Sequence, residues 1–284
     1  MTDSQWLHLH NKPLEDIRGK IPEEDYINSQ FDVARETRPS KLLLLLGTPR
    51  SGSTYLCGLL KANNICLPHE YFQPWEYMPL LAERWQCLSA EGGIDKQKYL
   101  RELIKHRTYE SGVLGINLHA DHLSVFRQFE DALPDIPVEI IHLIRRDTIK
   151  QAISYDIAKQ TDGWSSHFEK RAEPTYNYEA IRQKADTINS GNLLISAYAA
   201  TRGIPAKTIY YEDLVISPAQ ALGAALGISD LVSDNTGKGL KRQSGPLNDQ
   251  WAKQFAADLV QQETTKPGKR KRKGRKGKLK FWQR

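Results

Sequence analysis

The chain has 284 residues, a length that suits one large α/β domain, and its formal net charge is +6. This charge comes from residues 266–284, which hold eleven Lys or Arg and no acid, so the rest of the chain carries 29 basic and 34 acidic side chains. The sequence has no apolar span of 18 residues and no apolar signal core near its start, which excludes a membrane-spanning protein. The cysteines, Cys57, Cys66 and Cys87, have no paired spacing, which excludes a disulfide framework and a zinc knuckle. Together these features predict a cytoplasmic protein.

The composition divides the chain into one domain, over residues 1–265, and a basic tail, over residues 266–284. Within the domain, the polar residues 1–40 predict a lead-in with short helices and no catalytic role. The tail is a block of like charges, a composition that is typical of disorder. It would attract nucleic acid or anionic lipid, with Phe281 and Trp282 at a membrane interface, or else remain a solvated tail.

The most informative stretch is LLLLLGTPRSGSTYLCGLL, residues 42–60. The unbroken apolar run 42–46 predicts a strand that is buried on both faces, and a helix is expected over 53–62. The amides that open such a helix attract anions. The turn adds a cation and three hydroxyls at the same place, so we predict an anion-binding loop that contains Arg50, Ser51, Gly52, Ser53 and Thr54.

This loop differs from the usual nucleoside triphosphate loop, GxxxxGK[ST], in which a lysine contacts the terminal phosphates and a hydroxyl contacts magnesium. Here the sequence is GTPRSGST, so an arginine stands within the turn and no lysine precedes the hydroxyl pair. The pattern therefore predicts an anion that is held without a metal. The alternative is an ordinary strand-to-helix turn with a serine at the start of the helix.

A second polar group follows the short apolar run 65–67, which we predict to be the next parallel strand. Its carboxyl end would return to the edge of the sheet that holds the anion loop. Glu70 would then lie beside the anion, although a solvated loop carboxylate is the alternative. The same reasoning places four further candidates for substrate contact at this edge: His69, Tyr71, Phe72 and Gln73.

Two further strands are predicted to end at the same edge. Residues 112–118 precede His119 and His122, for which no nearby third metal ligand is evident, so we expect His119 to contact substrate and expect no metal. Residues 138–144 precede Arg145 and Arg146, which predict a second phosphate contact, since guanidinium groups match phosphate oxygens in pairs. The alternative is a pair of surface arginines that bridge carboxylates.

The remaining predicted elements complete an α/β fold. Residues 74–111 have helical spacing and would line an acceptor pocket. A helix follows the arginine pair to about residue 161 and carries Ser154, which would face the same phosphate. We also expect a long helix over 178–202, a strand over 207–211, a helix over 219–226 and a loop over 238–251. The whole predicts an open parallel sheet flanked by helices.

Several separated pieces together resemble the sulfotransferases that use 3′-phosphoadenylyl sulfate (PAPS). TPRSGSTYLCGLL resembles their 5′-phosphosulfate loop, and LIRRDTIKQAISYDIAKQT resembles their 3′-phosphate motif. KRQSGPLNDQWAKQF and IYYEDLVISPAQAL are similar to their late arginine-containing loop and the elements before it. The segment LPHEYFQ is closest to the trehalose 2-sulfotransferase family, and the resemblance extends over about residues 42–259.

The resemblance implies a P-loop type of fold, PAPS as the sulfuryl donor, the nucleotide PAP as product and no metal. It implies that Glu70 is the general base, that Arg50 stabilises the leaving oxygen and that the loop 51–54 holds the 5′-phosphate. The 3′-phosphate would be held by Arg145 or Arg146, of which we favour Arg145, together with Ser154, Arg242 and Gln243. A sugar or glycolipid acceptor and a homodimer are implied as well. The family often has a lysine near position 117, where this chain has Asn117, so acceptor recognition stays open.

Two other functions are compatible with parts of the sequence. A P-loop kinase or NTPase would need GK[ST] and a strand that ends in a magnesium-binding Asp, whereas the best strand here ends at Arg145 and Arg146. A nucleic-acid-binding or membrane-tethered protein would act through the tail, residues 266–284.

Overall fold

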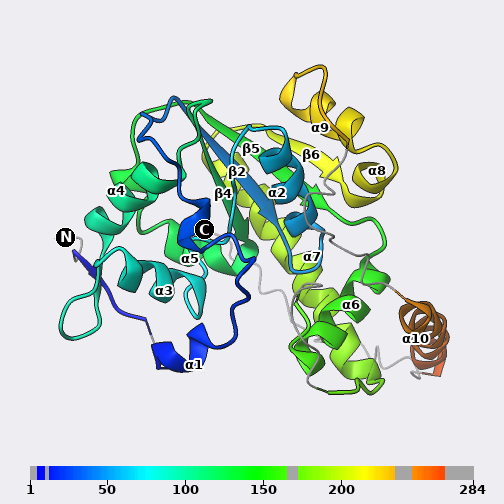
Figure 1. The fold of residues 1–284 in the computed structure, drawn as a ribbon. Coiled ribbons are helices and arrows are strands. Elements are labelled where there is room, and N and C mark those ends of the chain that lie inside the picture. The colour runs from blue at the N-terminus through cyan, green and yellow to red at the C-terminus, as the bar shows by residue number, and fades with distance from the viewer. Residues whose placement is uncertain (1–4, 10–12, 165–171, 234–244, 266–284) are drawn as a thin grey trace, which may run out of the picture.

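The structure is a computed structural model that describes residues 5–9, 13–164, 172–233 and 245–265. Its centre is a parallel sheet of four strands in the order β4-β2-β5-β6 (Figure 1). The strands are β2 (Lys41–Gly47), β4 (Val113–His119), β5 (Val138–Ile144) and β6 (Ala206–Tyr210). A second, two-stranded antiparallel sheet joins β1 (Trp6–Leu7) to β3 (Ile94–Asp95).

The helices surround this sheet. The α-helices are α1 (Leu14–Arg18), α2 (Ser53–Ala62), α3 (Tyr77–Arg84), α4 (Lys96–Arg107), α5 (Leu123–Phe126), α6 (Thr148–Thr161), α7 (Tyr178–Thr201), α8 (Tyr211–Ile216), α9 (Pro218–Leu226) and α10 (Pro246–Thr265). Short 3-10 helices are η1 (Ser29–Phe31), η2 (Ala120–His122) and η3 (Glu130–Ala132). None of the helices in the described ranges is long and apolar enough to cross a membrane.

The leucine run forms the centre of the core because its side chains alternate between the two faces of β2. Leu42, Leu44 and Leu46 pack with α3, α4, α5 and α7, whereas Leu43 and Leu45 pack with α2, α8 and α9. Figure 1 shows α3, α4 and α5 on one side of the sheet and α2, α8 and α9 on the other. All five leucines are at most 2% exposed, as expected for a central strand that is covered on both faces.

The register brings the carboxyl ends of the strands to one edge. Gly47, the last residue of β2, lies opposite His119 of β4, and Leu46 lies opposite His142 of β5. The predicted strands at 42–46, 112–118, 138–144 and 207–211 are all present within one residue, and helices span 53–62, 178–201 and 218–226. The expected open parallel sheet flanked by helices is therefore confirmed.

Two predicted elements are wrong. Residues 65–67 form no strand. The backbone N–H of Asn117 in β4 instead donates to the carbonyl of His69 at 3.0 Å, two residues past the predicted strand. The segment packs directly on Gly115, where an added Cβ would lie 2.7 Å from the Sγ of Cys66. Of the predicted loop at 238–251, residues 238–244 lie outside the described residues, and the remainder is helical from Pro246, with Trp251 of α10 buried against α6 and α7.

The lead-in is part of the domain core. Ile17 of α1 and Ile27 are buried in the same cluster as α3 and α4. Arg107 of α4 is fully buried, donates hydrogen bonds to the carbonyls of Ile27 and Phe31, and forms an ion pair with Asp32 at 2.9 Å. A buried cation with this many partners fastens the N-terminal segment to the domain.

Candidate active site

The loop between β2 and α2 presents open amides and a buried hydroxyl. Gly52 precedes α2 with φ +100°, no side chain caps the helix, and an added Cβ at Gly52 would lie 2.5 Å from the ring of Tyr211. The Oγ of Ser51 is buried without a hydrogen-bond partner among the described residues. Open helix amides next to an unused donor fit an anion.

Gln151 of α6 holds the loop in place through two hydrogen bonds. The amide nitrogen of Gln151 donates to the Oγ1 of Thr48 at 2.9 Å and to the carbonyl of Pro49 at 2.8 Å. Sequence analysis missed this residue, because a glutamine within a helix carries no signal that it faces a loop more than a hundred residues away. The contact fixes the loop before any ligand arrives.

Two arginines face the same region. The Nε of Arg50, which has φ +65°, donates to the Oγ of Ser154 at 3.1 Å, and an NH group donates to the carbonyl of Trp164. Burial, together with the nearby charge of Arg145, lowers the pKa of Arg50 to about 10. The guanidinium of Arg145 itself lies 5.0 Å from the ring centre of Tyr211. With a pKa of about 10, Arg50 stays charged at neutral pH, so an anion near both guanidinium groups would relieve their repulsion.

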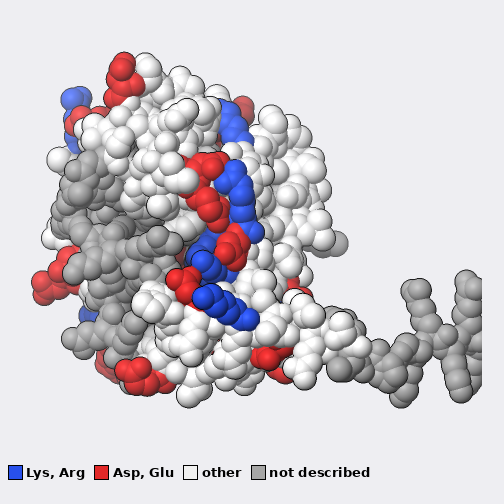
Figure 2. All heavy atoms as spheres, turned by 90° about the vertical axis from the view of Figure 1, so that its right-hand side faces the viewer, with Lys and Arg blue, Asp and Glu red and all other residues white. Residues whose placement is uncertain are grey.

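Arg146 has a different environment from Arg145. Its guanidinium forms a two-pronged ion pair with Asp213 at 2.7 and 2.8 Å, and it lies 3.8 Å from the ring centre of Tyr210. The side chain is nearly half exposed. On the side of the molecule that faces right in Figure 1, Lys and Arg alternate with Asp and Glu along a band (Figure 2). Arg146 therefore forms a surface ion pair with a carboxylate, which is the alternative that sequence analysis left open.

Glu70 lies at the same edge of the sheet, beside two histidines. Its Oε2 is 3.7 Å from the Nδ1 of His119 and 3.8 Å from the Nε2 of His122. Burial raises the pKa of Glu70 to about 7, which suits a group that takes up a proton near neutral pH. Glu70 lies at the edge of the sheet where we expected it. An extended segment precedes it, however, and not the strand that we predicted over residues 65–67.

His119 connects Glu70 to the anion loop. Its Nε2 lies 3.3 Å from the Oγ of Ser53, the first residue of α2, while its Nδ1 faces Glu70. Burial and the charge of Arg50 lower the pKa of His119 to about 4, so the ring is neutral at pH 7. Thr54, the next loop residue, is exposed. The structure thus brings Arg50, Ser53, Glu70 and His119 together.

The cluster of Glu70, His119 and His122 has the spacing of a metal site, since one ligand atom of each lies within 4.8 Å of the others. Sequence analysis found no third ligand, because Glu70 is distant in the chain. The donors do not fit a metal, however. The Nδ1 of His122 accepts the backbone N–H of His119 at 3.2 Å, so the proton of the neutral ring is on Nε2, the atom that faces the cluster. We assign no metal to these residues.

Three of the predicted substrate contacts pack inside the protein instead. Tyr71 and Phe72 are fully buried in the core, and the Tyr71 hydroxyl donates to the carbonyl of Leu67 at 2.7 Å. Gln73 is buried and accepts the backbone N–H groups of Glu76 and Tyr77 at the start of α3. These positions correct the expectation of direct contact, because a ring with no exposed surface cannot reach a ligand.

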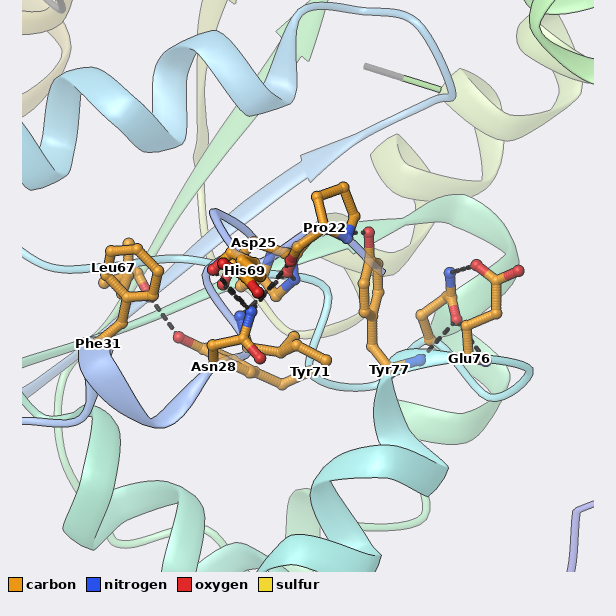
Figure 3. A network of polar contacts seen from close by, with 12 residues as sticks. Pro22, Asp25, Asn28, Phe31, Leu67, His69, Tyr71, Glu76 and Tyr77 are labelled. Atoms are coloured by element: carbon orange, nitrogen blue, oxygen red, sulfur yellow. Dashed lines mark hydrogen bonds and ion pairs between the residues drawn. The ribbon is translucent and has the colours of Figure 1, made fainter. Parts of the chain in front are cut away.

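His69 is held by the N-terminal segment. Its Nε2 lies 3.0 Å from the Oδ1 of Asp25, whose Oδ2 accepts the hydroxyl of Tyr77 at 3.2 Å. Figure 3 shows these side chains gathered around Asp25, with the ring of His69 near those of Tyr71 and Tyr77. Sequence analysis missed Asp25, since it gave the lead-in no role. Trp75, by contrast, is 45% exposed and has its ring edge against His122.

Two predicted nucleotide contacts, Arg242 and Gln243, lie outside the described residues. Tyr211, which the prediction did not include, backs Gly52 and lies near Arg145. It could have been found by the rule that placed the arginines, because it directly follows the carboxyl end of a parallel strand.

Comparison with known proteins identifies the family. Comparison with curated proteins gave no match. Among solved structures, the sulfotransferase domain from the Synechococcus PCC 7002 olefin synthase aligns at 17% identity and a TM-score of 0.39, over 79% of this chain and 96% of that one. The family model described as Stf0 sulphotransferase matches residues 43–258, three quarters of the chain. The chain therefore belongs to the Stf0 sulphotransferase family, and its chemistry is the transfer of a sulfuryl group.

Proposed function

We propose that this protein transfers a sulfuryl group from PAPS to a hydroxyl of a carbohydrate or glycolipid, with Glu70 as the general base. One observation carries the proposal: a largely buried carboxylate with a pKa of about 7 faces His119, whose other nitrogen contacts Ser53 of the anion loop. His119 thus lies next to both the proposed base and the proposed anion site. This arrangement suits a reaction between a hydroxyl and an anionic donor.

The residues present fit the two phosphates of the donor. The amides of residues 52–54 and the buried Oγ of Ser51 would hold the 5′-phosphate, while the Ser51 amide donates to the carbonyl of Thr48. Arg145 and Ser154 would hold the 3′-phosphate, together with Arg242 and Gln243, which the resemblance assigns to the same role. PAPS supplies the activated sulfuryl group. A loop without the lysine of GK[ST] and a strand that ends in arginines disfavour the alternative of a P-loop kinase.

The proposed reaction needs one proton acceptor and one stabiliser of negative charge. A bond forms between the acceptor oxygen and sulfur, and the bond between sulfur and the bridging phosphate oxygen breaks. The acceptor proton moves to Glu70, and the electron pair of the broken bond stays on the phosphate oxygen. Arg50 and the loop amides would stabilise that oxygen, so the site works by positioning and electrostatics.

On the proposed acceptor side, Trp75 is an exposed aromatic ring among the residues that the structure describes. Trp75 stands beside His122 with much of its surface free, and such rings stack on sugars. We include a homodimer in the proposal on the strength of the family resemblance, and a cytoplasmic location because three cysteines without paired spacing are typical of a reducing compartment. Contact of residues 266–284 with an anionic membrane or nucleic acid is a further part of it, since the charge of that segment favours both.

Glu70→Gln tests the proposed base. Turnover with PAPS and a sugar acceptor should fall by about 10²–10⁴-fold, because the amide cannot take up the acceptor proton. Calorimetry should show that PAP still binds the variant nearly as tightly as the wild type and that both prefer PAP to ATP. Full activity of Glu70→Gln would exclude this base and direct attention to His69 or His119. A preference for ATP would overturn the donor assignment.

A further inference from the structure

We propose that His122 is a positioning residue that presents a fixed N–H group to the carboxylate of Glu70. The proposal rests on the proposed function, in which Glu70 is the base. His122 was not among the predicted site residues, and its ring is almost completely buried, with 1% of the side chain exposed. A buried imidazole without a metal needs a partner for each nitrogen; here the Nδ1 has a hydrogen bond and the Nε2 faces two carboxylates.

The first step is the position of the ring proton. The Nδ1 of His122 accepts the backbone N–H of His119 at 3.2 Å, so this nitrogen carries no proton. Burial lowers the pKa of His122 well below its ordinary value, and the ring is neutral at pH 7. A neutral imidazole has one proton, which must therefore be on Nε2. The backbone thus selects the tautomer.

The second step is the direction of that proton. The Nε2 of His122 lies 3.8 Å from the Oε2 of Glu70 and 3.8 Å from the Oδ1 of Asp121. The side chain of Asp121 is half exposed to solvent, whereas the side chain of Glu70 is 18% exposed. The less exposed carboxylate gains more from a donor. A distance of 3.8 Å is longer than a hydrogen bond, and catalytic hydrogen bonds often shorten when the substrate binds.

The third step is the rigidity of the ring. His122 ends the short helix η2, its ring stacks on that of His119 at 5.2 Å, and Trp75 packs edge-on at 5.4 Å. With its Nδ1 held by the backbone, the ring cannot turn away without losing this hydrogen bond. The donor is therefore aimed before the acceptor arrives, which is the condition for a preorganised site.

The consequence concerns the charge of Glu70. Besides burial, three carboxylates around it raise its pKa: Asp121 from η2, Glu76 from its own segment and Asp25 from the N-terminal segment. His69 lowers its pKa, while Tyr77 of α3, Cys57 of α2 and His119 complete the surroundings. A donor on Oε2 favours the ionised carboxylate, the form that a base needs, and a nitrogen that already holds a proton cannot compete for the acceptor proton.

Two variants of His122 separate this role from simple packing. His122→Asn keeps an acceptor near the Nδ1 position and removes the donor at the Nε2 position, whereas His122→Gln keeps a donor at the Nε2 position. The pKa of Glu70 is measured by carbon-13 carboxyl NMR in full-length protein, with the resonance assigned from Glu70→Gln. We expect the pKa to rise by about one unit in His122→Asn and to stay near the wild-type value in His122→Gln.

The controls make the outcome decisive. His106→Gln, a partly exposed histidine on α4, should leave the pKa of Glu70 unchanged. Nitrogen-15 NMR of the wild-type protein should place the proton of His122 on Nε2, a result that needs no variant. Equal pKa values in the Asn and Gln variants, or a proton on Nδ1, would overturn the proposal.

In each variant, the pH at which kcat/KM for PAPS falls on the acid side should shift by the same amount as the pKa of Glu70 that NMR measures. If the wild-type protein does not transfer sulfuryl groups, the proposed function fails while the NMR comparison still decides the role of His122.

Discussion

At the scale of single residues, neighbouring side chains of one type have separate roles. Arg145 and Arg146 follow the same strand, yet Arg145 lies near Arg50 and Tyr211, while Arg146 pairs with Asp213 on the surface. The reason is the alternation of side chains past the strand end, which sends one guanidinium toward the loop and the next away from it. The sequence alone left both arginines as candidates, because alternation does not say which face holds the ligand.

This difference predicts unequal effects on nucleotide binding. Arg145→Ala should weaken the binding of PAP by about 10–100-fold, because it removes charge-assisted hydrogen bonds to a phosphate. Arg146→Ala is the matched control and should change the Kd less than twofold, since its partner is Asp213. Calorimetry with both variants checks the assignment, and a larger loss in Arg146→Ala would reverse it.

At the scale of elements, a segment before the family match holds the loop of the proposed base. Asp25 lies outside residues 43–258, yet its carboxylate contacts His69, accepts the backbone N–H of Ile27 and accepts the hydroxyl of Tyr77. Burial alone would raise the pKa of Asp25, but contact with His69 and these hydrogen bonds lowers it below the ordinary 3.8. The ionised form of Asp25 therefore stabilises the folded protein.

Asp25→Asn should consequently lower stability in a pH-dependent way. Because the folded-state pKa is lowered, the stabilisation is fully present above pH 3.8 and is lost as the pH falls through the folded value. At pH 7 the variant should lose about 2 kcal/mol of unfolding free energy, and the difference should shrink below about pH 4. Denaturant titrations at pH 7 and pH 3.5 measure it. Asp16→Asn, on the exposed side of α1, should have little effect, and a pH-independent loss would contradict the assigned cause.

The elements that sequence analysis predicted well are those whose signal is local. The leucine run and the arginine turn identified β2, α2 and the turn between them, because alternating burial and helix-end chemistry are fixed by nearby residues. Residues 65–67 misled the prediction, since three apolar residues before a proline fit a packed extended segment as well as a strand. The contacts of Asp25 and Gln151 connect distant parts of the chain and leave no local trace.

At the scale of the whole molecule, the family match and the last described helix both end before the basic tail, residues 266–284. α10 ends at Thr265 and packs on α6 and α7, so the tail begins where the last described helix stops. The family match ends at residue 258, before the tail as well. The chemistry that we propose uses residues of the sheet edge, and none of these lies in residues 266–284.

Removal of residues 266–284 should therefore leave turnover with PAPS and a soluble acceptor within about twofold, because no element of the site is lost. Binding to vesicles of anionic lipid or to nucleic acid, where the full chain shows it, should fall strongly in the shortened protein, since eleven positive charges are removed. Loss of sulfuryl transfer with the fold intact would instead give the tail a direct part in the reaction.

The ring of His119 touches both halves of the site, with Ser53 on one nitrogen and Glu70 near the other. A ligand that moves this ring when it binds on the nucleotide side also changes the contacts that the ring offers to the second ligand. Linkage then makes the coupling reciprocal: a nucleotide that tightens sugar binding by some factor is itself bound more tightly, by the same factor, once the sugar is in place. In the proposed reaction, this one imidazole would therefore couple the binding of the nucleotide to the binding of the acceptor.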